Sequence, residues 1–139
     1  MKYSANKIIE VGCAIIRHQG RILIAQRKPD VFLGNYWEFP GGKREPNESI
    51  EECLAREVEE ELGVKVKASK LLCEVRHTYP DKDLKLCFWF CDWQSGTACK
   101  KDCQDFRWVT PNELPNFKFP PADDDILKDI LANQKKYFH

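Results

Sequence analysis

Apolar and β-branched runs along the chain predict a set of β-strands. The segment "IIEVGCAIIRH" is rich in Ile and Val, and "QG" then turns the chain into "RILIAQRK", which together predict a β-hairpin. "NYWEFPGG" has the pattern of a short strand that ends in a glycine turn. "PDKD" is a turn between two longer apolar runs. The expected strands are 8–18, 21–28, a short one within 35–42, 64–79, 84–93 and 106–109.

Helical periodicity and capping residues predict two helices. The first is expected to run from about Asn47, a good N-cap, to Leu62, with Gly63 as its C-terminal stop. The second covers 122–136, where acidic residues at the start and basic residues at the end match the helix dipole. "TPNE" (110–113) has the form of a capping box. The fold class is therefore α/β, with a mixed sheet and helices packed on it, in one domain over 1–139.

The first helix carries four carboxylates in five positions: Glu57, Glu59, Glu60 and Glu61. At about 100° per residue, Glu57 and Glu61 fall inside the apolar arc of the helix and Glu60 lies at its edge, whereas Glu59 faces solvent. Arg56 points about 100° away from Glu57, so we do not expect it to be their partner. Unpaired carboxylates in a core are costly. Clustered oxygen ligands of this kind suit a hard divalent cation such as Mg²⁺.

Composition and charge narrow the function classes. Lys plus Arg and Asp plus Glu are equal at 22 each, so no global field attracts a nucleic acid polymer or an anionic membrane. Residues 1–10 lack the apolar region of a signal peptide, and no 18-residue apolar run occurs, so a cytoplasmic protein without membrane contact is expected. The chain has seven cysteines, an odd number, and no CxxC motif, which argues against a disulfide framework. Cys87 and Cys91 are expected to pack as small apolar residues, not to bind zinc.

The acidic run belongs to a longer pattern, G-x5-E-x7-R-E-V-x-E-E-x-G-V. Its members are Gly42, Glu48, Arg56, Glu57, Val58, Glu60, Glu61, Gly63 and Val64. With this pattern complete, the chain resembles the Nudix hydrolases, which act on nucleoside diphosphates linked to another moiety.

The resemblance implies an α/β/α sandwich and a set of site residues. Glu57, Glu60 and Glu61 would bind Mg²⁺ or Mn²⁺, helped by the main-chain carbonyl of Gly41. Arg56 would orient a catalytic carboxylate through a salt bridge, and Glu48 would support the pattern or its metals. The reaction is attack of water on a phosphorus atom, which metals assist by neutralising charge. Asp102 stands where relatives often carry a glutamate near the metals; as a shorter residue it is either a ligand or base, or a solvated loop carboxylate.

Outside this pattern, "AQR" (25–27), "WEFPGGK" (37–43) and "FPPAD" (119–123) are similar to the MutT-like branch, the nucleoside triphosphate pyrophosphohydrolases. In that branch Arg27 would contact the nucleotide; the other interpretation is a surface charge after a strand. Phe39, Tyr79 and Trp37 are candidates for stacking on a base or for the core. Asp123 either caps the last helix or accepts hydrogen bonds from a base edge, such as the N4 amine of cytosine.

These features predict a Mg²⁺-dependent hydrolase that converts a nucleoside triphosphate and water to the monophosphate and pyrophosphate, with CTP and modified cytosine nucleotides favoured. The first alternative is an 8-oxo-dGTP diphosphatase, since guanine also presents donors. A dinucleoside-polyphosphate or nucleotide-sugar hydrolase is a further enzyme class. A noncatalytic Nudix nucleotide-binding module is the alternative from another class. The expected partner is a small nucleotide, with the chain as a monomer or homodimer.

Overall fold

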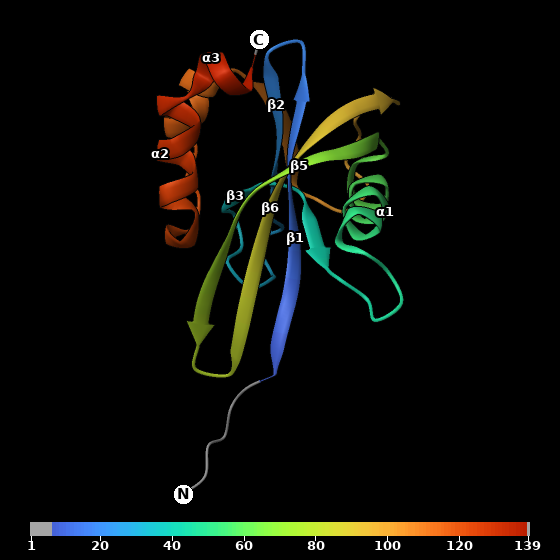
Figure 1. Ribbon diagram of the computed structural model, residues 1–139, viewed down its shortest axis with the longest axis vertical. Coiled ribbons are helices and arrows are strands. Elements are labelled where there is room, and N and C mark those ends of the chain that lie inside the picture. The colour runs from blue at the N-terminus through green and yellow to red at the C-terminus, as the bar shows by residue number, and fades with distance from the viewer. Residues whose placement is uncertain (1–6, 139) are drawn as a thin grey trace, which may run out of the picture.

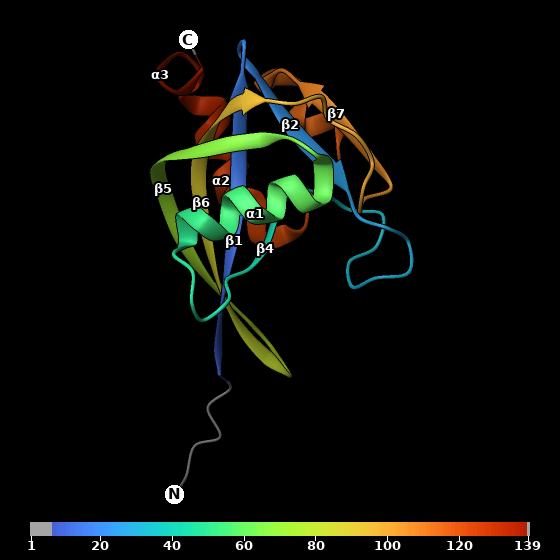
Figure 2. The same cartoon turned by 90° about the vertical axis from the view of Figure 1, so that its right-hand side faces the viewer.

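A seven-stranded mixed sheet lies between helices in the computed structural model, which describes residues 7–138 (Figure 1). α1 covers one face of the sheet, and α2 and α3 lie on the other side (Figure 2). The expected mixed sheet with helices on it is confirmed. The strands are β1 (Ile8–His18), β2 (Arg21–Gln26), β3 (Trp37–Glu38), β4 (Gly41–Lys43), β5 (Lys65–Tyr79), β6 (Lys82–Ser95) and β7 (Asp105–Val109). The helices are α1 (Ile50–Leu62), η1 (Pro111–Asn116), η2 (Pro121–Asp123), α2 (Asp124–Ala132) and α3 (Gln134–Tyr137).

The strand order is β3-β2-β1-β6-β5, with β4 paired to β1 and β7 paired to β2. β1 and β2 form the predicted hairpin, and Gln19 and Gly20 at its turn have φ values of 51° and 75°. β5 and β6 form a second antiparallel hairpin. β1 and β6 pair in parallel from Ile8 opposite Asp83 to Arg17 opposite Asp92. This one parallel junction joins the two hairpins into a single sheet.

Alternate side chains of β1 and β2 supply two separate cores. Ile15 and Ile24 point to the face covered by α2, where they join Phe88, Phe90 and Ile130. On the other face, a second cluster packs beneath α1: Ala14, Ile16, Leu23, Leu54, Val58 and Leu62. Because a strand exposes successive side chains on opposite faces, one apolar run serves both layers.

The helix boundaries differ from the sequence predictions at two places. α1 is capped by Ser49, not Asn47: the Ser49 hydroxyl accepts from the Glu52 N–H, and the Glu52 side chain accepts from the Ser49 N–H, which completes a capping box. Gly63 ends α1 with φ 73°, as predicted. The single helix expected over 122–136 is instead divided, because Asn133, with φ −124°, interrupts it between α2 and α3.

The remaining predictions concern the capping box at 110–113, the cysteines and the membrane. Thr110 and Glu113 form that box, on a short 3-10 helix. All seven cysteines are free, and Cys87 and Cys91 are buried on β6. Within residues 7–138, no helix has the length and apolar character needed to cross a membrane.

Candidate active site

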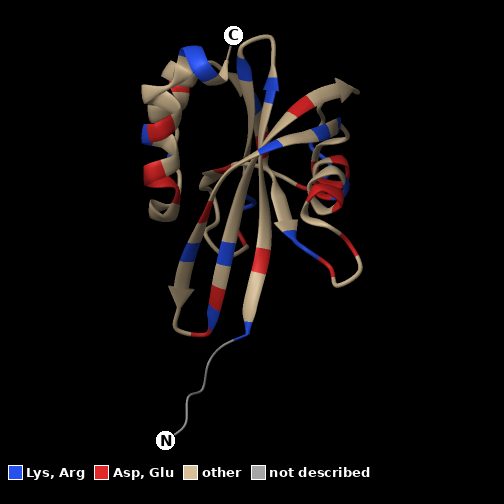
Figure 3. Cartoon of the chain, in the orientation of Figure 1, with Lys and Arg blue, Asp and Glu red and all other residues tan. Residues whose placement is uncertain are grey.

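Three carboxylates of α1 face a pocket of about 190 Å³ at the C-terminal half of that helix. Glu60 and Glu61 follow Glu57 by three and four positions, which places both of them beside Glu57 on one side of the helix. They line this acidic pocket together with Arg27, Lys28, Val31, Glu38, Gly41 and Asp102. Figure 3 shows the acidic residues gathered on α1. The helix therefore concentrates negative charge at a surface hollow.

Arg56 is bonded to several of these carboxylates, contrary to the expectation that it points away from them. Its guanidinium donates to Glu48 Oε1 at 2.6 Å, to Glu57 Oε2 at 2.9 Å and to Glu60 Oε1 at 3.3 Å. The helical angle describes where the Cβ atom points, whereas the long arginine side chain curves back around the helix. The contact with Arg56 lowers the pKa of Glu48 to about 2, and the Glu48 and Glu57 carboxylates raise the pKa of Arg56.

Glu61 differs from its neighbours because no described residue balances its charge. Its side chain is 8% exposed, and its Oε1 atom has no hydrogen-bond partner within residues 7–138. Burial, followed by the negative charge of Glu38, raises the pKa of Glu61 to about 9. Burial also raises the pKa of Glu57, against the opposing effect of Arg56. An uncompensated buried carboxylate at a pocket wall is a group that requires a cation or a proton.

Asp102 reaches the same pocket from the loop before β7. Its carboxylate accepts a hydrogen bond from Lys28 Nζ at 2.9 Å, which raises the pKa of Lys28, and its side chain is 73% exposed. The Asp102 side chain is thus both solvated and paired. In the described part of the chain, no three acidic, histidine or cysteine side chains are arranged to hold one metal ion. Arg56 and Lys28 occupy oxygens that a cation would otherwise attract.

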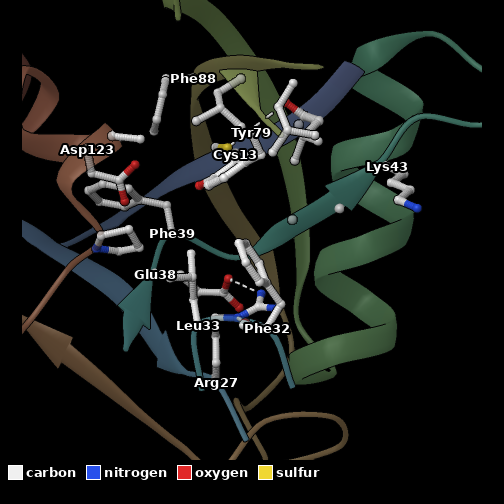
Figure 4. A pocket seen from close by; sticks show the side chains of 18 of the residues that line it. Cys13, Arg27, Phe32, Leu33, Glu38, Phe39, Lys43, Tyr79, Phe88 and Asp123 are labelled. Atoms are coloured by element: carbon white, nitrogen blue, oxygen red, sulfur yellow. Dashed lines mark hydrogen bonds and ion pairs between the residues drawn. The ribbon is translucent and has the colours of Figure 1, made fainter. Parts of the chain in front are cut away.

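A second, more apolar cavity of about 310 Å³ adjoins the acidic pocket (Figure 4). The cavity and the acidic pocket share three lining residues, Arg27, Glu38 and Gly41, which form a common wall between the two hollows. The Arg27 guanidinium donates to Glu38 Oε1 at 2.8 Å and to the Phe32 carbonyl at 2.8 Å. Burial raises the pKa of Glu38, and the charge of Arg27 opposes that rise. Arg27 therefore lies at the junction of the two hollows and is not an isolated surface charge.

The inner end of the cavity holds Asp123 among aromatic side chains (Figure 4). Asp123 is 7% exposed and stands at the N-cap of α2, but its side chain makes no capping hydrogen bond. Burial, then the charge of Glu38, raises its pKa to about 7. Phe39 lines the cavity and contacts Phe88 and Phe119, with ring centroids 6.1 and 5.1 Å away. The carboxyl group thus faces a cavity with apolar walls.

Comparison with known proteins places this geometry in a family. The model of the NUDIX domain family matches residues 11–129. The chain belongs to the Nudix family. It is 34% identical over 126 residues to a CTP pyrophosphohydrolase of Escherichia coli strain K12, an alignment that covers 91% of this chain and 93% of that protein. It is 31% identical over 125 residues to the 8-oxo-dGTP diphosphatase of the same strain, an alignment that covers 89% of this chain and 97% of that protein.

Solved Nudix structures share the fold. The solution structure of the E. coli ORF135 protein superposes with a TM-score of 0.81 at 33% identity, covering 95% of this chain and 94% of that one. The MutT protein of Methanosarcina mazei Go1 superposes with a TM-score of 0.82 at 22% identity, covering 94% of this chain and 97% of that one. At this identity the similarity concerns the fold alone. This Nudix chain therefore belongs to a hydrolase family whose members in general use divalent metal ions.

The structure also separates the aromatic candidates. Tyr79 lines the apolar cavity of this Nudix chain, whereas Trp37 is buried in the core with its ring 4.9 Å from that of Phe117. Sequence reasoning missed five polar or aromatic residues of the cavity wall: Phe32, Glu38, Lys43, Lys82 and Phe88. Glu38 stands within the quoted "WEFPGGK", so its segment was recognised but its position between the two hollows was not. Phe32 lies in a turn, and Lys82 is the first residue of β6, within the segment predicted as the "PDKD" turn. Neither belongs to a periodic pattern, so neither gave a signal.

Proposed function

We propose that this chain is a Mg²⁺-dependent nucleoside triphosphate pyrophosphohydrolase that favours cytosine nucleotides. The observation that carries the proposal is the shared wall of Arg27, Glu38 and Gly41 between an acidic pocket and an apolar cavity. A nucleotide has a matching division, since its base is flat and mostly apolar and its phosphates are charged. The base would occupy the cavity and the phosphates the acidic pocket, which they enter together with a cation.

The donor set consists of oxygens, the ligands that a hard divalent ion prefers, although in the described residues three of its carboxylates are not grouped around one point. Glu57, Glu60 and Glu61 supply carboxylate oxygens, the Glu61 oxygen without a partner is the one most in need of a cation, and Gly41 would add a main-chain carbonyl. Asp102 is a further candidate ligand from the opposite wall. When bound, Mg²⁺ or Mn²⁺ neutralises charge on the phosphate oxygens and activates water.

The chain's own residues would position and balance the reacting groups. Arg56 holds Glu57 and Glu60 in place through the hydrogen bonds described above, which leaves either carboxylate oriented to accept a proton from the attacking water. Water adds to phosphorus, the bond to the leaving phosphate oxygen breaks, and the products are the nucleoside monophosphate and pyrophosphate. Arg27 would orient the nucleotide at the junction of the two hollows.

Asp123 is the residue on which we expect the choice of base to depend. Because its pKa lies at about 7, the carboxyl group is present in both protonation states near neutrality. A protonated carboxyl donates one hydrogen bond and accepts another, which complements N3 and the N4 amine of cytosine. The ionised form accepts only and complements the N1 and N2 hydrogens of guanine, so the 8-oxo-dGTP alternative depends on the same residue.

The first test is pyrophosphate release from a panel of nucleoside triphosphates with and without Mg²⁺. We expect turnover with Mg²⁺ and a loss of kcat of about 100-fold or more in Glu60→Gln and in Glu61→Gln. Glu59→Gln is the matched control, because Glu59 is an exposed carboxylate of the same helix outside the acidic pocket. Near wild-type turnover in both pocket variants would refute the metal assignment. Binding of a nucleotide without turnover by the wild type would favour the noncatalytic module.

The second test compares kcat/KM for CTP, 5-methyl-dCTP and 8-oxo-dGTP in the wild type and in Asp123→Asn. We expect the wild type to favour a cytosine nucleotide and the substitution to change the ratio between cytosine and guanine substrates. A wild type that prefers 8-oxo-dGTP by more than about tenfold, or unchanged ratios in the variant, would overturn the cytosine preference.

A further inference from the structure

The loop between β2 and β3 carries an exposed phenylalanine that no family pattern assigns. Phe32 is 50% exposed, and it also lines the apolar cavity. Its ring meets the ring of Tyr79 edge to face, with centroids 5.2 Å apart. Tyr79 is at the end of β5, at the tip of the second hairpin. Two segments distant in sequence therefore touch across the rim of the cavity.

A lysine reinforces this contact. The Nζ atom of Lys82, the first residue of β6, lies 4.4 Å from the Phe32 ring centroid and 5.7 Å from that of Tyr79. Cation–π contacts and edge-to-face aromatic pairs both stabilise such an arrangement beyond simple burial. We name the three residues Phe32, Tyr79 and Lys82 the rim clasp.

Hydrogen bonds hold the loop in the position that forms the clasp. Arg27 Nε donates to the Phe32 carbonyl at 2.8 Å, and the Asn35 N–H donates to the Arg27 carbonyl at 3.1 Å. The Gln104 side-chain amide donates to Asn35 Oδ1 at 2.8 Å and to the Arg27 carbonyl at 3.1 Å. The backbone that carries Phe32 is thus held by hydrogen bonds within the chain.

The same loop lies beside both hollows. Phe32 and Leu33 line the apolar cavity, while Lys28 and Val31 line the acidic pocket. A ligand that extends from one hollow into the other must pass along this loop. The base and the phosphates of the proposed nucleotide form such a ligand, so the inference rests on the proposed function.

We propose that Phe32 is a substrate-retaining residue, which through the rim clasp closes the mouth of the cavity over the bound nucleotide and slows its release. Because contacts within the chain itself order the loop, wild-type binding does not include the entropic cost of ordering it. Without the Phe32 ring the loop loses its contact with the hairpin tip, and the ligand must then order it. The chemical step is unaffected, since Phe32 does not line the acidic pocket.

The test measures binding and release separately from turnover. The probe is a CTP analogue with a non-hydrolysable methylene group between the α and β phosphorus atoms, titrated by calorimetry with Mg²⁺. In Phe32→Ala we expect Kd to rise about tenfold, and KM for CTP to rise by a similar factor with kcat unchanged. Phe32→Tyr keeps the ring and should restore wild-type affinity. Leu71→Ala is the matched control, because Leu71 is also a large exposed apolar residue, 39% exposed, but lies outside both hollows.

The other outcomes are informative as well. If Phe32→Ala binds the analogue as tightly as the wild type, the clasp does not retain substrate. If it binds more tightly because association is faster, the clasp is a barrier to entry and the proposal is overturned. Thermal unfolding of each variant establishes that the fold is intact. Absence of binding to the wild type itself would refute the proposed function, a result distinct from a failure confined to Phe32.

Discussion

At the scale of single residues, two carboxyl groups stand out in the described part of the chain. Glu61 and Asp123 are its buried charged side chains, at 8% and 7% exposure, and each faces a different hollow. Burying a carboxyl group without a partner opposes folding. Both residues are therefore costly to stability, which is the pattern expected where a site for a cation or a base edge has been built.

The burial of Asp123 predicts a defined dependence of stability on pH. Its pKa rises from an ordinary 3.8 to about 7, so between these values the folded protein holds a proton that the unfolded chain has lost. The stabilisation that this proton provides is present below about pH 4 and is lost as the pH rises through about 7. Relative to wild type, Asp123→Asn should gain in free energy of unfolding across that window, with no further change above it. Urea denaturation at several pH values measures the difference; a difference independent of pH would contradict the assignment.

Substitution of Asp102 should lower turnover by less than substitution of the glutamates of α1. The Asp102 side chain is shorter than that of a glutamate, largely exposed and paired with Lys28, so we expect it to reach a bound cation only through water. Asp102→Asn should lower kcat, but by less than Glu60→Gln, in steady-state assays with Mg²⁺. Asp105→Asn serves as the control, because Asp105 pairs with Arg107 and lies outside the acidic pocket. A loss as large as that of Glu60→Gln would make Asp102 a principal ligand or base, and no loss would make it a solvated loop residue.

At the scale of elements, the close approach of β4 to α1 explains a glycine of the family pattern. A Cβ atom on Gly42 would fall on the carboxylate of Glu57. Since a carboxylate at the end of a flexible side chain can move, Gly42→Ala should keep the fold but displace Glu57 from Arg56. We expect kcat to fall by about tenfold or more with little change in Tm.

Gly20→Ala provides the comparison for Gly42→Ala. Gly20 has φ 75° at the turn between β1 and β2, and a Cβ atom there meets nothing within 4 Å. This substitution should cost about 1 kcal/mol of stability through backbone strain and leave kcat unchanged. Equal catalytic losses in both variants would indicate that general destabilisation, not displacement of Glu57, is the cause.

The elements also show what the sequence can and cannot predict. The hairpins and α1 follow from periodicity and turn residues, because local contacts determine them. The helical angle alone placed Arg56 away from Glu57, which is wrong, because that angle does not describe a side chain long enough to curve around its own helix. The family resemblance, in contrast, implied a salt bridge from Arg56 to a carboxylate, and Arg56 makes one to Glu57. The rim clasp brings together Phe32 and Lys82, which are far apart in sequence, so no local pattern reveals it. The division of the last helix at Asn133 is instead accompanied by a local contact: the Asn133 side-chain amide donates to the Asp129 carbonyl at 3.0 Å, which helical periodicity does not describe.

At the scale of the whole molecule, the acidic pocket predicts that divalent cations stabilise the folded state. A ligand that binds only the folded protein adds stability, by about 2.7 kcal/mol at one hundred times its Kd. Mg²⁺ should therefore raise the Tm of the wild type by several degrees, and a chelator should reverse the rise. In Glu61→Gln the metal-free protein should be at least as stable as wild type, because an uncompensated carboxyl is removed, while the rise with Mg²⁺ should shrink. An equal rise in both proteins would show that the cation binds elsewhere.

The parallel pairing of β1 with β6 has a consequence for the order of folding during synthesis. β1 is synthesised early, but β6, the strand with which it pairs in parallel, begins only at Lys82. The two hairpins therefore cannot join until much of the chain has been made. α1 is synthesised between them and packs partly on β5, hence its apolar face must wait for a surface to cover it. Long-range closure of this kind is slow compared with helix or hairpin formation. A chain that stops at residue 81 contains every residue of the family pattern, yet we expect its amides to exchange hydrogen as those of an unfolded chain do.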